Sequence, residues 1–575
     1  MKNPLTACLG DAKKYAIITP IFVVGEVVLE IFIPFLMSKI IDNGIDLGDM
    51  DYIKRIGALL IITTIFSLVS GMLAGIFSAK ASARFSRNLR QAEFERVQTF
   101  SFANIDHFST AGLVTRMTTD ITNLQMAFMM IIRIAVRAPV MMIAALGMTC
   151  FINPKMALIY VVIIPFLTIA LQLIIRNAHP LFTKVFHTYD KLNEVVQENL
   201  LGIRVVKSFV REEKETDKFN QVSDEIYRLF SKAERLLAFN SPCMQFAVYT
   251  CILAISYFGA KFIVGGILTT GQLMNLISYA TQILMSLMMI SMVFVMITMS
   301  KASAQRVSEV LTEESTIHNP QNPVMHVADG SVVFDHASFS YGGNKNALSD
   351  VSLTIPSGAT VGIIGGTGSA KTTLVQLIAR LYDTTEGRVL VGGVDVKDYD
   401  LQTLRDAVSM VLQKNVLFSG TIAENLRWGD ADADMTQIRH AAKLACADEF
   451  VEKFPDQYET YIEQGGSNVS GGQKQRLCIA RALLKQPKIL ILDDSTSAVD
   501  TRTDALIRQA FQTEIPNTTK IIIAQRISSV EQADLILVMD DGQIVDCGTH
   551  EALLSRCSIY QEVYQSQQKG DDTHA

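Results

Sequence analysis

The sequence predicts two unlike parts, an all-α domain of six long apolar helices and then an α/β domain built around a glycine-rich loop. Apolar residues make up 49% of the 575 residues and charged residues only 19%, with a mean hydropathy of +0.27. The apolar surplus is concentrated in the first 300 residues, which is typical of a membrane domain. After Ser331, short β-branched runs alternate with helical patterns, which predicts strands and helices in turn.

Six stretches of the first part are long and apolar enough to cross about 30 Å of hydrocarbon, which takes roughly 20 residues. They are residues 15–40, 56–79, 126–151, 155–175, 241–264 and 272–298. Pro154 lies in a very short connection, so the third and fourth spans are expected to form a tight hairpin. The long polar stretches 80–125 and 176–240 also have helical patterns, which predicts that the spans continue as helices well beyond the bilayer.

The basic residues predict how these spans are oriented. Both long polar stretches are rich in Lys and Arg, whereas the connection 42–53 carries four aspartates and no basic residue. The positive-inside rule then places both long stretches and both termini in the cytoplasm. The first apolar run, from about Tyr15, is too long for a cleavable signal and lacks a small-residue cleavage site. We therefore expect a multi-pass protein of the cell (plasma or inner) membrane.

Two pairs of charged residues lie inside the predicted spans. Glu26 and Glu30 are four residues apart in the first span, and Arg133 and Arg137 have the same spacing in the third, so each pair shares a helix face. Ionisable groups at this depth usually face a partner or a water-filled cavity. One interpretation is mutual pairing, or arginines that extend towards the cytoplasm. The other is that the glutamates line a cavity that accepts cationic amphiphiles.

Charge and cysteine content exclude other classes of protein. The net charge of −6 argues against a nucleic-acid binder, whose surface would be basic. The eight cysteines are scattered, with no CxxC pair and no clustering with histidine. Reduced, unpaired thiols are therefore expected.

The glycine-rich loop, residues 365–372, lies between a buried-strand run at 361–364 and a helix that opens at Thr373. A phosphate-binding loop requires this context, because backbone N–H groups and a helix N-terminus suit polyphosphate. Lys371 would reach the β- and γ-phosphates, and the Thr372 hydroxyl would ligate Mg²⁺. The predicted ATP-binding residues here are Gly366, Thr367, Gly368, Ser369, Ala370, Lys371, Thr372 and Thr373.

Ala370 stands where the loop pattern has its last glycine. A methyl group there would strain the loop if the backbone needs a positive φ. The sequence leaves open whether nucleotide affinity is unchanged or reduced.

Two further motifs follow in fixed order. Ser470, Gly471, Gly472 and Gln473 form an intact signature loop, which is predicted to contact nucleotide. Residues 488–493 are a lysine and an apolar run that ends in Asp493, a carboxylate suited to Mg²⁺. The next residue, Asp494, has the chemistry of a general base for the attacking water.

Together these motifs resemble those of half-transporters of the ABC (ATP-binding cassette) exporter superfamily, over essentially the whole chain. The resemblance implies a type I exporter fold, with six spans ahead of one nucleotide-binding domain that takes ATP and Mg²⁺. It implies that Tyr341 stacks on adenine and that Gln413 links Mg²⁺ to the membrane domain. Ser497, Ala498, Val499 and Asp500 match a loop that crosses the dimer interface. Phe108, Gly112, Leu113, Arg116 and Asp120 resemble the first intracellular coupling segment, and 199–211 the second.

The resemblance also shows where this chain departs from the family. Asp494 replaces a catalytic glutamate and is one methylene shorter, a shift of roughly 1.5 Å, and misplacement by about 1 Å can cost on the order of 10²-fold in rate. Gln525 occupies the place of a histidine and cannot carry a proton as imidazole does. Both changes weaken the site built on this chain's own phosphate loop. The signature loop, which in this family serves the partner's site, is intact apart from Val469 in place of leucine.

These departures resemble the degenerate-site subunit of heterodimeric bacterial multidrug exporters. The expected function is ATP-driven export of a hydrophobic or cationic amphiphile, with a second, non-identical half-transporter that supplies glutamate and histidine. A homodimeric lipid or peptide exporter and an ATP-gated regulatory membrane protein remain as alternatives. The expected organisation is a transmembrane domain over 1–300, a linker over 301–330 that begins with a helix end, a nucleotide-binding domain over 331–565 and a disordered tail over 566–575.

Overall fold

The computed structural model describes residues 4–343, 345–494 and 499–572. Its contacts divide the chain into two units. The first comprises the residues up to Gln98 together with Thr110–Glu313, and the second comprises Thr99–Ser109 and the chain from Glu314 onward. The short segment 99–109 therefore packs with the second unit, although it is flanked on both sides by helices of the first.

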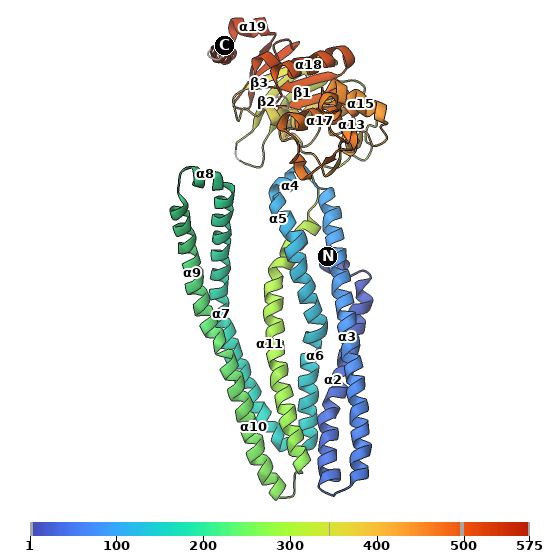
Figure 1. Cartoon of the computed structure of the whole chain (residues 1–575), viewed down its shortest axis with the longest axis vertical. Coiled ribbons are helices and arrows are strands. Elements are labelled where there is room, and N and C mark those ends of the chain that lie inside the picture. The colour runs from blue at the N-terminus through green and yellow to red at the C-terminus, as the bar shows by residue number, and fades with distance from the viewer. Residues whose placement is uncertain (1–3, 344, 495–498, 573–575) are drawn as a thin grey trace. The chain divides into compact units, whose positions relative to one another are not determined.

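In the part of the first unit that the structure describes, helices are joined by short connections, and six of them are long and apolar enough to cross a membrane, in agreement with the six predicted spans. Its elements, labelled in Figure 1, are α1 (Pro4–Ala7), α2 (Ala12–Ile40), η1 (Ile41–Ile45), α3 (Met50–Gln98), α5 (Thr110–Thr115), η2 (Arg116–Asp120), α6 (Ile121–Ile152), α7 (Pro154–Leu201), α8 (Ile203–Ser208), α9 (Glu212–Ala238), α10 (Asn240–Val264) and α11 (Thr270–Thr312).

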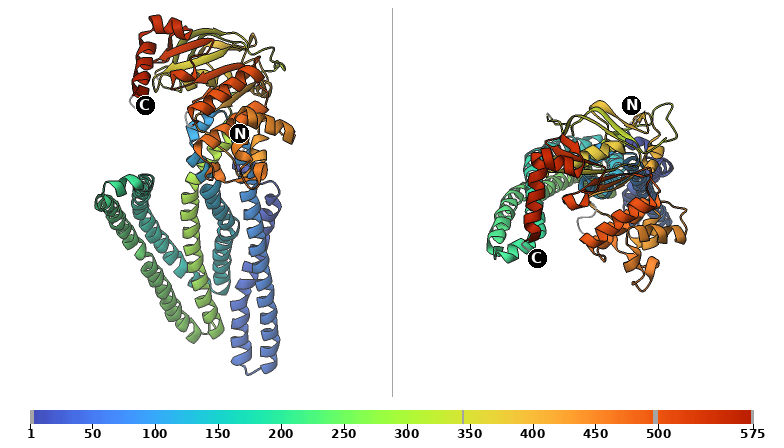
Figure 2. Two further views of the ribbon diagram at one scale, coloured as in Figure 1. Left: turned by 45° about the horizontal axis from the view of Figure 1, so that its top comes forward. Right: turned by 90° about the horizontal axis from the view of Figure 1, so that it is seen from above.

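The helices extend well beyond a bilayer, as the patterns in the polar stretches predicted. α3 has 49 residues, which at 1.5 Å per residue makes a rod of about 70 Å. α7 and α9 lie side by side and are joined at their tip by α8 (Figure 1). Figure 2 shows that α7 and α9 diverge from the other long helices of the unit and lie farthest from them at the α8 tip. The hairpin at Pro154 is also present, because the Asn153 side chain caps α7 by accepting from the N–H groups of Lys155 and Met156.

Buried tyrosines connect the long helices of the first unit. The Tyr160 hydroxyl on α7 donates to the Leu276 carbonyl on α11 at 2.9 Å. The Tyr279 hydroxyl donates to the Ile31 carbonyl on α2 at 2.8 Å. Both rings are fully buried, so the hydrogen bonds satisfy hydroxyl groups that would otherwise be costly in an apolar core.

Three of the four residues that make up the two charged pairs inside the spans form ion pairs. Arg137 on α6 forms ion pairs with Glu26 and with Glu30 on α2, and its Nη2 lies 2.7 Å from Glu30 Oε2. The two glutamates therefore share one guanidinium across a helix interface. This contact agrees with the first interpretation, in which the charged residues pair with one another. The second interpretation, a cavity that accepts cations, needs carboxylates that are not already paired with an arginine.

The second unit is built on a six-stranded sheet in the order β12-β11-β3-β10-β9-β6, with β12 antiparallel at one edge. Beside it lie a four-stranded antiparallel sheet, β2-β1-β4-β5, and a small β7–β8 pair. The strands are β1 (Val332–Phe339), β2 (Leu348–Ile355), β3 (Thr360–Gly365), β4 (Glu386–Val391), β5 (Val394–Asp395), β6 (Val408–Val411), β7 (Gly420–Thr421), β8 (Tyr461–Ile462), β9 (Ile489–Asp493), β10 (Thr519–Ile523), β11 (Leu535–Asp540) and β12 (Gln543–Gly548).

The second unit also contains helices. They are α4 (Phe102–Phe108), α12 (Lys371–Ile378), α13 (Leu401–Ala407), α14 (Ile422–Leu426), α15 (Met435–Leu444), α16 (Asp448–Val451), η3 (Gln457–Glu459), η4 (Gln464–Gly466), α17 (Gly471–Leu484), α18 (Thr501–Glu514), η5 (Ile527–Ser529), α19 (His550–Arg556) and α20 (Ser558–Asp572).

The buried strands supply two cores, because alternate side chains point to opposite faces of a sheet. Ile489 and Ile491 of β9 pack with the four-stranded sheet and α12. Leu490 and Leu492 pack with α14, α15, α17 and α18. The apolar run that precedes Asp493 is therefore a strand buried on both faces, as in parallel sheets covered on two sides.

α11 continues to Thr312, so the segment 301–330 begins with the end of a helix, as expected. The structure differs from the expected organisation at the C-terminus. α20 continues past Ser566 into the segment expected to be disordered. Gln567 is the physical reason, since its side chain accepts from the Ile527 N–H at 2.9 Å and donates to the Gln525 carbonyl at 2.8 Å. All eight cysteines are free, as predicted.

Candidate nucleotide-binding site

A cavity of about 750 Å³ lies at the carboxyl ends of β3, β9 and β10 in the second unit. In open α/β sheets this edge is where ligands bind. Most of the predicted site residues line it, namely Tyr341, Gly366, Thr367, Gly368, Ala370, Lys371, Thr372, Thr373, Gln413, Asp493, Asp494 and Gln525. Ser369 is buried beneath the loop, where its hydroxyl donates to the Gly366 carbonyl.

The loop between β3 and α12 folds around the Lys371 ammonium group. Nζ donates to the carbonyls of Gly365 and Gly366 at 2.9 and 2.7 Å and to Ser369 Oγ at 3.2 Å. Burial lowers the pKa of Lys371, and the carboxylates of Asp493 and Asp494 oppose that change. The ammonium group is thus held where it would face phosphate oxygens placed on the loop.

Ala370 caps α12 in the left-handed conformation, with φ +67° and ψ +23°. The sequence left the sign of this φ open, and the structure shows that it is positive. An L-residue in this region costs roughly 1–2 kcal/mol because Cβ approaches the following carbonyl, whereas glycine adopts it freely. The alanine therefore strains the phosphate loop.

Thr372 and Asp493 form the part of the site that fits Mg²⁺. The Thr372 hydroxyl donates to Asp493 Oδ2 at 2.9 Å, and Oδ1 lies 3.1 Å away. Asp493 ends β9 and is 2% exposed, and this burial raises its pKa. A hydroxyl, a carboxylate and the Gln413 side chain on the cavity wall are the hard oxygen donors that Mg²⁺ prefers.

Asp494 and Gln525 are in direct contact. The Gln525 Nε2 donates to Asp494 Oδ2 at 2.6 Å, and both side chains line the cavity. Asp494 adopts a positive φ of 49°. The Gln525 backbone is in turn held by Gln567, a residue that sequence analysis had placed in a disordered tail. Only the bonding of Gln567 in the folded chain identifies it as part of the site's support.

Tyr341 also lines the cavity. Its hydroxyl is 3.0 Å from Thr373 Oγ1 on α12, and the Phe339 ring meets it edge-on with centroids 4.7 Å apart. Desolvation of the phenol raises the pKa of Tyr341. The side chain stays 56% exposed, which leaves ring surface for a base to stack on.

The predicted signature loop lies elsewhere on the second unit, at the start of α17. Ser470 and Gln473 form a capping box, in which the Ser470 hydroxyl accepts from the Gln473 N–H and the Gln473 side chain accepts from the Ser470 N–H. The glycines Gly471 and Gly472 open the helix. The loop is thus preformed at the N-terminus of a 14-residue helix, where an anion is favoured.

Three other predicted segments have mixed outcomes. Ser497 and Ala498 lie outside the described residues, whereas Val499 is buried and Asp500 caps α18 through Thr503. In the first coupling segment, Phe108 is buried in the second unit. Gly112, Leu113, Arg116 and Asp120 belong to the first. The second segment, 199–211, forms the α7–α8–α9 tip.

Within the first unit, two residues of the first coupling segment bind α11. Arg116 Nη1 donates to the Arg306 carbonyl, and the Asp120 carboxylate accepts from Ser303 Oγ and from the Arg306 guanidinium.

The fold and the site define a membrane protein that carries its own P-loop ATP-binding domain behind six spanning helices. The model of the ABC transporter transmembrane region matches residues 16–287, and that of the ABC transporter domain matches residues 348–497. The chain belongs to the ABC transporter family and has the organisation of an exporter half-transporter.

Individual relatives are similar to this chain over most of its length. An uncharacterized ABC transporter ATP-binding protein of Bacillus subtilis, YfiB, is 36% identical over 97% of this chain and 98% of its own length. A fatty acid ABC transporter ATP-binding/permease protein of Mycobacterium bovis is 35% identical over 83% of this chain and 75% of its own length. A solved bacterial Atm1-family ABC exporter with ATP bound superposes with a TM-score of 0.83 at 25% identity, covering 98% of this chain and 99% of that one.

Proposed function

We propose that this chain is the degenerate-site half of a heterodimeric exporter. As an ABC exporter it couples ATP to transport of a substrate across the membrane, and the proposal concerns its own ATP site. There the nucleotide would be bound by the phosphate loop with Mg²⁺ at Thr372, Gln413 and Asp493, and hydrolysed slowly. Its signature loop, Ser470–Gln473, would complete a competent site on a partner with glutamate and histidine.

The hydrogen bond between Asp494 and Gln525 supports this proposal most directly. A general base must present a carboxylate oxygen to the attacking water in hydrogen-bonding geometry. Asp494 is too short to reach as far as glutamate, and one of its oxygens already accepts from the Gln525 amide at 2.6 Å. An amide also offers no titratable proton at the γ-phosphate. The two changes act on one reaction centre, which favours a specialised site.

The intact parts of the site support retained nucleotide binding. Lys371 is held against the phosphate loop by the Gly365 carbonyl, the Thr372 hydroxyl donates to Asp493, and Tyr341 has exposed ring surface. Binding without rapid hydrolysis suits a domain that closes on ATP and stays closed while the partner site turns over.

For the substrate, we propose an amphiphilic small molecule that leaves the cell. The name of the M. bovis relative, a fatty acid transporter, favours single-chain lipids as a second candidate beside amphiphilic drugs. A preference for cations has lost its main support, because Arg137 pairs with both Glu26 and Glu30. In this proposal both termini lie in the cytoplasm, where ATP is available.

The deciding experiment measures hydrolysis at each site of the assembly isolated from membranes. In a single turnover with γ-labelled ATP, the proposal expects a fast and a slow fraction of similar size, with the slow fraction assigned to this chain by photo-crosslinked nucleotide. One uniform rate, or robust substrate-stimulated ATPase activity of this chain purified alone, would contradict the heterodimer. ATP-driven uptake of labelled fatty acid and of a cationic dye into inside-out vesicles would separate the substrate classes, and no uptake of any substrate would favour an ATP-gated regulatory protein.

A further inference from the structure

Tyr382 lies between the aromatic end of the nucleotide cavity and helix α4. Its side chain is 8% exposed. On one side its ring meets the Tyr341 ring edge-on, with centroids 5.3 Å apart and planes at 86°. The Phe339 ring lies at the same centroid distance. The ring on which a base would stack therefore rests against Tyr382.

On its other side Tyr382 binds α4. The phenol hydroxyl donates to Asp106 Oδ2 at 2.6 Å, and the Phe102 ring lies with its centroid 6.0 Å from that of Tyr382. Phe102 and Asp106 are four residues apart, so they share one helix face. α4 thus contacts Tyr382 with a ring and a carboxylate from the same face.

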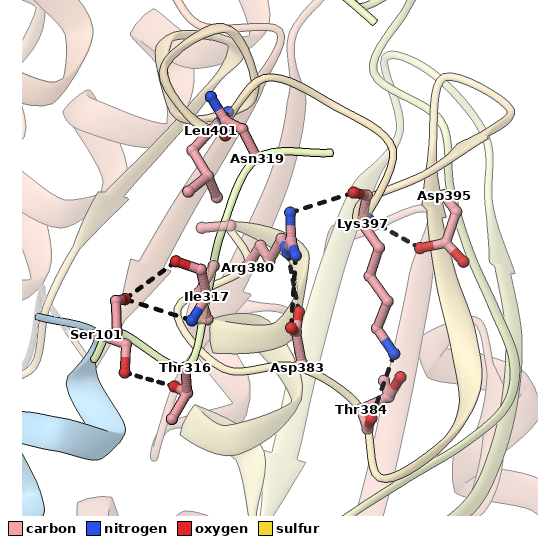
Figure 3. A network of polar contacts seen from close by, with 12 residues as sticks. Ser101, Thr316, Ile317, Asn319, Arg380, Asp383, Thr384, Asp395, Lys397 and Leu401 are labelled. Atoms are coloured by element: carbon pink, nitrogen blue, oxygen red, sulfur yellow. Dashed lines mark hydrogen bonds and ion pairs between the residues drawn. The ribbon is translucent and has the colours of Figure 1, made fainter. Parts of the chain in front are cut away.

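The surroundings fix both partners of this contact. Tyr382 follows Arg380, which is 5% exposed and whose guanidinium donates to Asp383 Oδ1 at 2.9 Å and to the Lys397 carbonyl at 3.2 Å (Figure 3). α4 is capped by Ser101, whose hydroxyl lies 2.7 Å from Thr316 Oγ1 (Figure 3). Because packed interiors deform little, a displacement of the Tyr341 ring would move Tyr382, and with it α4.

α4 is also joined by the chain itself to the membrane unit. Gln98 ends α3 three residues before the cap of α4, and α5 begins at Thr110, directly after Ser109. Both flanking helices belong to the six long segments with membrane-spanning character. A displacement of α4 would therefore also displace the end of α3 and the start of α5, which belong to two of these segments.

We propose that Tyr382 is a positioning residue that couples adenine stacking on Tyr341 to helix α4. The inference rests on the proposed nucleotide site. It adds that helix α4 responds to the adenine base of the bound nucleotide and not to its γ-phosphate. Coupling of this kind is reciprocal, so the contact between Tyr382 and α4 must also contribute to ATP affinity. In a site that hydrolyses slowly, base occupancy then remains a steady signal to α4.

Two magnesium complexes separate the base from the phosphates in the test, MgATP and magnesium tripolyphosphate. Their affinities are measured calorimetrically on the full-length chain in lipid nanodiscs. Tyr382→Phe and Asp106→Ala are each expected to weaken MgATP binding about 3- to 10-fold, the range of one net hydrogen bond. Magnesium tripolyphosphate should bind within twofold of its affinity for the unmodified chain. The double variant should lose no more than either single variant, and Asp106→Asn, which keeps an acceptor oxygen, should restore the affinity.

A matched control uses a second buried tyrosine of the same unit. The Tyr458 hydroxyl donates to Asp448 Oδ1, also at 2.6 Å, and Tyr458→Phe should leave both affinities unchanged. As a second readout, ATP and ADP should each slow amide hydrogen exchange in 102–108, and Tyr382→Phe should abolish that protection while the chain stays folded.

Each other outcome overturns the inference. Additive losses in the double variant, equal weakening for tripolyphosphate, or protection of 102–108 by tripolyphosphate would show that Tyr382 has only a structural role. If the unmodified chain binds MgATP and all the variants match it, the inference fails and the proposed nucleotide site stands. If the unmodified chain binds no MgATP, both fail.

Discussion

The side-chain amide of Gln525 donates a hydrogen bond to the carboxylate of Asp494, with Nε2 and Oδ2 2.6 Å apart. In the proposed function, this contact joins the two side chains that slow hydrolysis at this chain's own ATP site. It satisfies a carboxylate oxygen with a group that cannot take up a proton. The pair is therefore a stable arrangement in its own right.

Restoring both side chains is predicted to activate this site. Asp494→Glu with Gln525→His extends the base by one methylene and supplies an imidazole, and hydrolysis at this chain's phosphate loop should rise on the order of 10²-fold. Single-turnover phosphate release from the isolated assembly measures the effect, since the slow fraction should merge with the fast one. Either substitution alone should give less than the pair, and Asp494→Asn should leave the slow fraction slow. A double variant with the unmodified time course would contradict the assignment.

Ala370→Gly is predicted to relieve the strain in the phosphate loop. The backbone there has φ +67°, so glycine should stabilise the folded chain by about 1 kcal/mol. MgATP affinity should rise or stay equal, and the unfolding temperature of the nucleotide-free chain checks the sign. Ala379→Gly is the matched control, because Ala379 ends the same helix at φ −82°, where glycine should lower stability. Equal losses at the two positions would show that residue 370 carries no strain.

The buried Asp493 carboxyl predicts that two properties change in opposite directions with pH. These are the stability of the nucleotide-free chain and its Mg²⁺-dependent affinity for ATP. Burial raises the pKa of Asp493, so its contribution to folding is fully present below the ordinary aspartate pKa and is lost as pH rises through the raised value. Mg²⁺ binds the deprotonated form, so Mg²⁺-dependent ATP affinity should fall as pH is lowered. At pH 7, Asp493→Asn should match or exceed the unmodified chain in nucleotide-free unfolding temperature while losing the Mg²⁺ dependence. A lower unfolding temperature of the nucleotide-free variant would show that the ionised carboxylate stabilises the fold, contrary to this prediction.

Gln567 is predicted to stabilise the loop that carries Gln525. Gln567→Ala removes two hydrogen bonds, to the Ile527 N–H and the Gln525 carbonyl, and should cost about 1–2 kcal/mol locally. Amide exchange around 525–529 should quicken, while the phosphate loop stays protected. Gln568→Ala is the control, because the Gln568 side chain donates to the Tyr564 hydroxyl instead. Similar exchange in the two variants would show that the C-terminal helix does not support the site.

Sequence patterns predicted most of the fold, because apolar span length and buried-strand runs are local signals. The motifs also predicted that the phosphate loop, Asp493, Asp494 and Gln525 belong to one site. The structure places them together because the carboxyl ends of neighbouring parallel strands lie at the same edge of the sheet. The sequence patterns missed Gln567 and Tyr382. Nothing about a polar tail or a single tyrosine marks a residue whose role depends on partners 42 and 276 positions away. The conformation of Ala370 was likewise invisible, because a residue name does not fix φ.

Arg137 is predicted to be the most sensitive residue of the membrane unit. It pairs with both Glu26 and Glu30, and its guanidinium and the Glu26 side chain are largely shielded, at 24% and 12% exposed. Arg137→Ala would leave two carboxylates facing each other without a cation, which should cost about 3–5 kcal/mol and lower the unfolding temperature in detergent.

Removing the carboxylates together with the arginine tests the reason for this sensitivity. The triple variant Glu26→Gln, Glu30→Gln, Arg137→Gln should recover much of the lost stability, because an uncompensated charge costs more than the intact pair contributes. Arg133→Ala, one turn away on the same helix, should have a smaller effect. If Arg137→Ala were as stable as Arg133→Ala, the ion pairs would be irrelevant to stability. If the triple variant kept its stability but lost uptake of a cationic dye alone, the glutamates would be restored as substrate contacts.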